Sequence, residues 1–265
     1  MGSDAFKLPP LKPELYQWHP SPEDPSLLQR RANGVETWVG TKDVNHPGCY
    51  DFYQVAVLRL VDVSGLSLSK FKKALVHALL DARFENPIIS SYGVWGKHEK
   101  AHLPYITYKS LEGTKEAEAW ANDIIQIRAT SLNSQQLRAE RFRKRQESGV
   151  VKPSNQLDVI VSADVASEDT IFAPGTKVEA ILFFNHVTWD GKGRFFCAEL
   201  LQRAIDILDN GKESEPTTHK WGEEMERLDK PILDSMQVAL DELDEEELVK
   251  LQKEFIEKHS KIGVS

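Results

Sequence analysis

Apolar residues recur along the chain with the period of either a strand or a helix. Residues 50–60, YDFYQVAVLRL, are rich in β-branched and aromatic side chains that alternate to one side, which is typical of a strand. Residues 67–84, SLSKFKKALVHALLDARF, place apolar side chains near helical spacing, with Ser67 or Ser69 as the candidate N-cap. We therefore expect a strand that is followed by a helix.

The central part of the chain continues with shorter segments. Residues 86–95 restart in extended form after Pro87, and residues 103–111 are a further strand candidate. Residues 114–130, TKEAEAWANDIIQIRAT, predict a helix. Residues 138–146, RAERFRKRQ, form a basic, helix-like stretch that we interpret as a solvated face, with a counter-charge for a phosphorylated cofactor as the alternative.

Two strands and a helix follow the basic stretch. Residues 155–165 and 177–187 predict strands, with the turn signal APGT between them. Residues 194–211 predict an amphipathic helix that ends at Asn210 and Gly211. The junction between the second strand and this helix carries the sequence NHVTWDGKG.

The two ends of the chain differ from its middle. Residues 1–26 contain six of the 13 prolines, which predicts an arm without regular structure. Residues 212–265 are acidic, and we expect a polar linker followed by a C-terminal helix with Leu248, Leu251 and Phe255 on one face. Residues 27–211 are then the single α/β domain.

Composition narrows the class of protein. With 265 residues and 40% apolar content, the chain can bury a core. No apolar run approaches the roughly 20 residues of a membrane helix, and a net charge of -8 argues against nucleic acid as a partner. Two cysteines make no disulfide framework, no secretory signal or metal-ligand cluster is visible, and we expect a cytoplasmic protein.

His186 is the strongest candidate for a catalytic group. It lies where a buried strand ends, so its imidazole can project into a cleft, and a pKa of about 6.5 suits it to accept a proton near neutral pH. Asp190 and Gly191 then reverse the chain, because glycine permits dihedral angles that other residues avoid. The other seven histidines have no comparable surroundings.

The H-x-x-x-D-G pattern of residues 186–191 resembles the signature of a known superfamily. It contains chloramphenicol acetyltransferase, plant-type acyl-CoA-dependent acyltransferases and peptide-synthetase condensation domains. The segments NHVTWDG and RRANGVETW, residues 30–38, are most similar in pattern to fungal secondary-metabolite O-acetyltransferases of the trichothecene type. The resemblance implies a chloramphenicol-acetyltransferase-like α/β fold, with a mixed β-sheet backed by helices.

The resemblance also implies roles for individual residues. His186 would be the general base, while Asp190 would brace the loop through an ion pair and Gly191 would allow the turn. Asn185, in the place of the first histidine of doubled-histidine versions, and Trp189 are candidate substrate-binding residues, although Trp189 also suits the core. The candidate ion-pair partners of Asp190 are Arg30, Arg31, Arg59 and Arg83.

The implied reaction is acyl transfer from an acyl-CoA, such as acetyl-CoA, to a hydroxyl group of a small natural product, with no tightly bound cofactor. Two-domain relatives are much longer and supply a second half with a DFGWG-like motif that this sequence lacks. Three explanations are compatible with that difference. A neighbouring copy could supply the missing wall, the chain could be a half that depends on a partner, or the cleft could serve a cyclase or isomerase. A binding or assembly subunit without activity is a further alternative.

Overall fold

The computed structural model describes residues 13–94, 105–148, 156–162, 169–189, 195–213 and 218–230, together with positions 167, 193, 215, 246, 249–250 and 253–254. The chain divides into two compact units, Met1–Asp229 and Lys230–Ser265. All the strands described below belong to the first unit.

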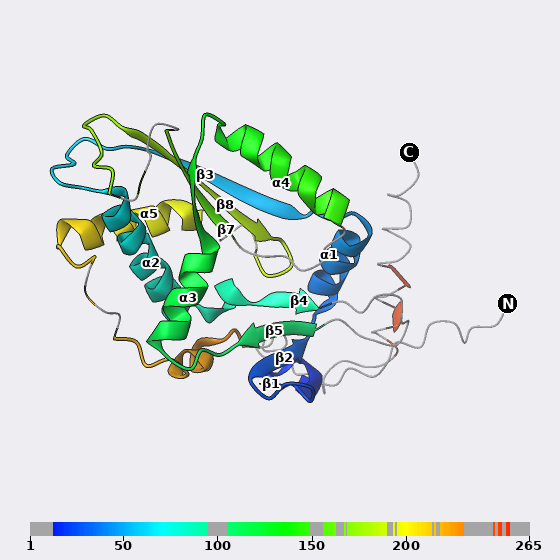
Figure 1. Ribbon diagram of the computed structural model, residues 1–265. Coiled ribbons are helices and arrows are strands. Elements are labelled where there is room, and N and C mark those ends of the chain that lie inside the picture. Colours follow the sequence, from blue (N-terminus) through cyan, green and yellow to red (C-terminus); the bar gives the residue numbers. More distant parts are fainter. Residues whose placement is uncertain are drawn as a thin grey trace. The chain divides into compact units, whose positions relative to one another are not determined.

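The first unit contains two four-stranded sheets (Figure 1). In the larger sheet the order is β3 (Asp51–Arg59), β8 (Lys177–Asn185), β7 (Gln156–Val161) and β6 (Ile125–Ala129). β8 pairs antiparallel with both β3 and β7, whereas β6 and β7 are parallel, so this sheet is mixed. The smaller sheet is antiparallel, in the order β1 (His19–Pro20), β2 (Leu27–Arg31), β5 (Tyr105–Lys109) and β4 (Tyr92–Val94).

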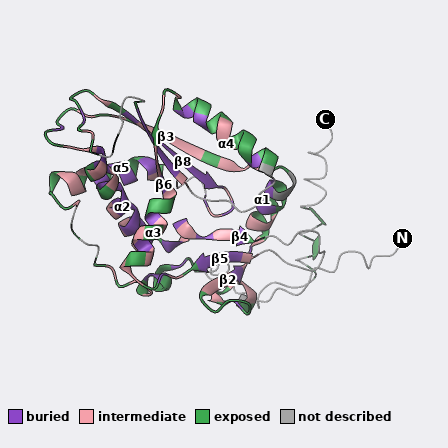
Figure 2. Cartoon of the chain, viewed as in Figure 1, coloured by how far each residue is buried: buried purple, intermediate pink, exposed green. Residues whose placement is uncertain are grey.

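Helices cover both faces of the larger sheet because successive side chains of its strands point in opposite directions. Val178, Ala180, Leu182 and Phe184 of β8 join the main core with α2 (Leu68–Glu85), α3 (Thr114–Ile124) and α5 (Phe196–Asp209). Ile181 and Phe183 face the other way and pack with Leu137 of α4 (Ser134–Ser148). Figure 2 shows the result, with β8 buried between helices and the outer side of α4 exposed. The predicted α/β class is confirmed.

The predicted helix at residues 67–84 is confirmed as α2. Its N-cap is Ser67, whose hydroxyl accepts a hydrogen bond from the Lys70 amide at 3.2 Å. The predicted strands at 50–60, 103–111, 155–165 and 177–187 correspond to β3, β5, β7 and β8.

Two predicted elements in the middle of the chain need correction. The helix predicted over residues 114–130 ends at Ile124, because Ile125–Ala129 form a strand that pairs with β7. The extended segment predicted at 86–95 begins instead with a 3-10 helix, η3 (Pro87–Ser90), and only then forms β4. Proline at the first position of a helix suits that start.

Both ends of the predicted domain are more ordered than the pattern indicates. The proline-rich arm contains a 3-10 helix, η2 (Pro13–Tyr16), and β1, which pairs with β2. The polar segment after α5 includes η5 (Glu223–Arg227), and Glu224 is fully buried.

A further helix, α1 (Gly34–Asn45), begins with a capping box at Asn33.

In the second unit, described positions 246, 249, 250, 253 and 254 are helical. The predicted apolar face at Leu248, Leu251 and Phe255 lies outside the described residues.

Candidate active site

His186 begins the turn that follows β8. Its amide donates a hydrogen bond to the Tyr50 carbonyl at 3.0 Å, and the Thr188 amide donates to the Asn185 carbonyl at 3.4 Å. The first bond continues the pairing of β8 with the segment before β3. The histidine is therefore held at the end of a strand in the middle of the larger sheet.

The imidazole of His186 has a defined orientation. Its Nδ1 lies 2.7 Å from the carbonyl oxygen of Trp189, and its ring centroid lies 4.3 Å from that of Phe52. A carbonyl oxygen can only accept, so Nδ1 must carry the hydrogen in this contact. In the neutral ring the lone pair is then on Nε2, which has no hydrogen-bond partner among the described residues. This is the arrangement that a general base needs.

Directly before the histidine, the Asn185 side chain enters a buried polar network. Its Nδ2 donates to Asp51 Oδ1 at 3.0 Å and to Asp43 Oδ2 at 3.3 Å, and its Oδ1 accepts from the Val187 amide at 2.9 Å. Arg145 contacts both carboxylates at 3.0 Å. We call this set, Asn185, Asp43, Asp51 and Arg145, the Asn185 network.

The Asn185 network joins four elements. Asp43 lies near the end of α1, Asp51 begins β3, Arg145 belongs to α4 and Asn185 ends β8. Burial raises the pKa of Asp43, which Arg145 and the Gly48 amide oppose. Sequence reasoning assigned neither aspartate nor the arginine to the site, because these contacts join residues that lie far apart in the chain.

The basic stretch predicted as a solvated face is only partly so. Arg143 and Lys144 are exposed on α4, whereas Arg145 is buried in the Asn185 network. Arg141 lies over the Phe183 ring, with its guanidinium carbon 4.5 Å from the centroid. Burial lowers the pKa of Arg141. The two arginines share the sheet-facing side of α4, because Arg141 is four positions after Leu137 and Arg145 is four positions after Arg141.

Trp189 packs in the main core. Its ring centroid lies 4.7 Å from that of Phe184 and 4.9 Å from that of Phe196, and its side chain is buried. Gly193 lies against the same indole, because a Cβ at position 193 would be 2.5 Å from Trp189 Cε3. The carbonyl that orients His186 is therefore held by a residue that is itself fixed by packing.

Asp190 and Gly191 lie outside the described residues. Of the four arginines proposed as partners of Asp190, Arg30 pairs with Glu36 at 2.7 Å, and Arg83 is buried and donates to the Lys109 carbonyl. The guanidinium of Arg31 lies over the Tyr16 ring, and Arg59 ends β3.

Cys197 is buried at the start of α5. Burial raises the pKa of its thiol to about 11. Because a nucleophilic cysteine needs a lowered pKa, this environment favours a packing role for Cys197.

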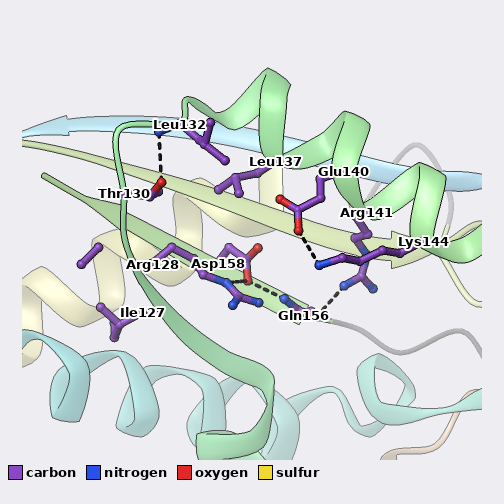
Figure 3. A pocket seen from close by; sticks show the side chains of 11 residues that line it. Ile127, Arg128, Thr130, Leu132, Leu137, Glu140, Arg141, Lys144, Gln156 and Asp158 are labelled. Atoms are coloured by element: carbon purple, nitrogen blue, oxygen red, sulfur yellow. Dashed lines mark hydrogen bonds and ion pairs between the residues drawn. The ribbon is translucent and has the colours of Figure 1, made fainter. Parts of the chain in front are cut away.

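One cavity, with a volume of about 410 Å³, lies between α4, β6 and β7 (Figure 3). Its polar side chains contact one another: Arg141 donates to Gln156, which donates to Asp158, and Arg128 pairs with Asp158. The second cavity, of about 390 Å³, lies beside residues 59–66 and the end of α5. His186 lines neither of them.

The described residues contain no group of three or more histidine, cysteine, aspartate or glutamate side chains that could hold a metal ion. Among the helices of the same residues, none has the length and apolar character to cross a membrane.

Comparison with known proteins places this geometry in context. Residues 8–256 match the family described as 15-O-acetyltransferase Tri3. The chain is 54% identical over 239 residues to the putative 15-O-acetyltransferase SAT12 of Stachybotrys chartarum, covering 90% of this chain and 42% of that protein. It is 36% identical over 252 residues to the trichothecene O-acetyltransferase TRI3 of Trichoderma arundinaceum, covering 93% of this chain and 48% of that protein.

A solved structure shows the same fold. The TRI3 trichothecene 15-O-acetyltransferase from Fusarium sporotrichioides matches with a TM-score of 0.73 and 29% identity, over 90% of this chain and 47% of that chain. The expected chloramphenicol-acetyltransferase-like fold is thus confirmed. The chain spans about half the length of the relatives it matches. On the match over residues 8–256 and these identities, the chain belongs to the Tri3 family of 15-O-acetyltransferases.

Proposed function

We propose that this protein takes part in acetyl transfer from acetyl-CoA to a hydroxyl group of a small natural product of the trichothecene class. Membership of the Tri3 family supports the reaction class and the acceptor. The observation that carries the proposal is the contact between His186 Nδ1 and the Trp189 carbonyl, because it leaves Nε2 as the proton acceptor.

In the proposed reaction, His186 Nε2 takes the proton from the acceptor hydroxyl while the oxygen attacks the thioester carbonyl carbon of acetyl-CoA. A C–O bond forms and the carbonyl becomes a tetrahedral oxyanion. When the oxyanion collapses, the C–S bond breaks, and the imidazolium returns its proton to the departing thiolate. The products are the acetyl ester and free CoA.

The other motif residues are proposed to shape the site. Asp190 and Gly191 form the bend after His186, as the resemblance implies. Asn185 and Trp189 hold the site in place and do not contact substrate. The side-chain amide of Asn185 is engaged in the Asn185 network, and the indole of Trp189 is packed in the core. Substrate contacts then come from other surfaces.

We propose that one wall of the acetyl-CoA site comes from a second copy or from a partner chain. The resemblance supports this, because its two-domain members supply a second half, whereas the chain spans about half the length of the relatives it matches. Size-exclusion chromatography with light scattering, with and without acetyl-CoA, tests it. Turnover by a strict monomer would contradict it.

The reaction itself is tested by incubating the protein with acetyl-CoA and a trichothecene that has a free hydroxyl, and measuring the acetyl ester by mass spectrometry. His186→Ala should reduce the rate by about 10²- to 10⁴-fold, since a general base contributes that much. His77→Ala, which changes a histidine of α2 away from the site, is the matched control. Equal rates for wild type and His186→Ala, or an absence of product when the oligomer or the partner complex is assayed, would overturn the proposal.

A further inference from the structure

We propose that the Asn185 network is a positioning device for His186, which fixes the backbone on both sides of the imidazole without touching substrate. This inference rests on the proposed function, because it assigns a purpose to the orientation of the base. No part of the reaction passes through these side chains.

The Asn185 network is linked directly to the turn that carries His186. Asn185 and Val187 are the two neighbours of His186, and the Asn185 Oδ1 accepts the Val187 amide hydrogen at 2.9 Å. This bond from residue i to i+2 closes the backbone around the histidine. The position of the Asn185 side-chain amide therefore determines the position of the His186 backbone, from which the imidazole projects.

The side-chain amide of Asn185 is itself anchored by two carboxylates. Asn185 is 2% exposed, and its Nδ2 donates to two carboxylates, Asp43 and Asp51. Arg145 holds both carboxylates from α4, through Nη2 and Nε. If the amide rotated, the buried Asn185 Nδ2 and the Val187 amide would lose these partners, which is costly.

The charges of the Asn185 network are costly to bury. Three charged groups are brought into a site where Asp43 is 2% and Arg145 is 8% exposed. Apolar residues of the same volume are often at least as stabilising as a buried ion pair, so such a pair is weak evidence for a stabilising role. A polar network at the strand end before the proposed base is better explained by the geometry that it imposes.

The test is a substitution that keeps the shape of the side chain and reverses its chemistry. Asn185→Asp retains an oxygen for the Val187 amide but places a third carboxylate against Asp43 and Asp51. In protein with labelled histidine, long-range proton–nitrogen NMR at pH 8 reports which imidazole nitrogen carries the hydrogen. We expect the Nδ1–H form in wild type and a mixture of both forms in Asn185→Asp.

A second substitution provides rescue. Asn185→Asp combined with Asp51→Asn restores the donor and acceptor at the shorter contact, 3.0 Å, and should recover at least part of the Nδ1–H form. Tyr108→Phe is the control, because it removes a buried hydrogen bond elsewhere in the first unit and should leave the His186 signal unchanged. In turnover, Asn185→Asp should reduce kcat on the order of a hundredfold with KM unchanged.

Each outcome of these experiments supports or overturns the positioning role of the Asn185 network. A folded Asn185→Asp variant with the wild-type His186 signal would overturn the inference. If that variant does not fold, Arg145→Lys takes its place, since lysine keeps the charge but cannot bridge both carboxylates with a planar fork. Failure of both to fold would also overturn the inference, because the network would then support the whole domain. The NMR signal needs no substrate, so failure of acetyl transfer is distinguishable from failure of positioning.

Discussion

At the scale of single residues, the contact between Trp189 and Gly193 decides how firmly His186 is oriented. The Trp189 carbonyl accepts the His186 Nδ1 hydrogen, and the Trp189 indole packs between Phe184 and Phe196. Gly193 borders that indole so closely that any side chain at position 193 would displace it. Disturbing the indole should therefore disturb the histidine as well.

Gly193→Ala should destabilise the protein by about 1–3 kcal/mol, because the added methyl group overpacks the core. A Cβ there would lie 2.5 Å from Trp189 Cε3. The measurement is urea unfolding followed by tryptophan fluorescence. Gly34→Ala is the matched control, since nothing lies within 4 Å of its added Cβ. Equal unfolding midpoints for the two variants would contradict this packing.

Some residues of the site could be predicted from the sequence and others could not. His186 could be found from the H-x-x-x-D-G spacing, since the motif is local. Asp43 and Arg145 could not, because they are 102 positions apart in the chain and meet only in the folded structure, where their contact joins α1 to α4. The one clue to Asp51 was the strand at residues 50–60, since pairing with the strand that ends at Asn185 places the two residues opposite each other.

At the scale of elements, η5 is attached to the domain by a buried polar contact. Glu224 is fully buried and accepts a hydrogen bond from the Tyr108 hydroxyl at 2.8 Å. Arg83 of α2, also buried, lies over the Tyr108 ring with its guanidinium carbon 5.5 Å from the centroid. Burial raises the pKa of Tyr108, so the hydroxyl stays protonated and continues to donate. This contact explains why the segment after α5 packs as part of the first unit.

Tyr108→Phe should lower the free energy of unfolding by about 1–3 kcal/mol, because it leaves a buried carboxylate oxygen of Glu224 with one donor fewer. Tyr105→Phe, on the same strand, has no hydroxyl hydrogen bond among the described residues and should change stability little. Chemical denaturation of both variants measures the difference. If Tyr105→Phe cost as much as Tyr108→Phe, the contact with Glu224 would not be what attaches η5.

Elements with a strong local pattern were predictable, and those that depend on distant partners were not. β3, α2 and β8 carry long runs of regular periodicity, so the sequence pattern located them. β6 follows α3 without a break, and its strand form depends on pairing with β7, which no local signal reports. η5 likewise depends on burial of one glutamate against β5.

At the scale of the whole molecule, the two cysteines report separately on surface and core. Cys49 is exposed, whereas Cys197 is buried at the start of α5, with a pKa raised to about 11. A thiol reagent needs both access and a thiolate. Cys197 therefore becomes reactive only when the first unit opens.

At pH 8, a disulfide reagent should label one thiol of the native protein quickly and the second only with denaturant. Cys49→Ser should abolish the fast phase. Because folding raises the Cys197 pKa above its ordinary value of 9.0, the neutral thiol stabilises the fold below that pH, and this contribution is lost as pH rises toward about 11. Rapid labelling of both thiols in native Cys49-containing protein would contradict the burial of Cys197.

The central claim is that His186 is held with its hydrogen on Nδ1, so that Nε2 is the base. Long-range proton–nitrogen NMR of the wild-type protein, with labelled histidine and at a pH above the imidazole transition, measures this directly, and His186→Ala assigns the signal. We expect a single Nδ1–H form for His186. A predominant Nε2–H form would contradict it, because the nitrogen that is to accept the proton would already carry one.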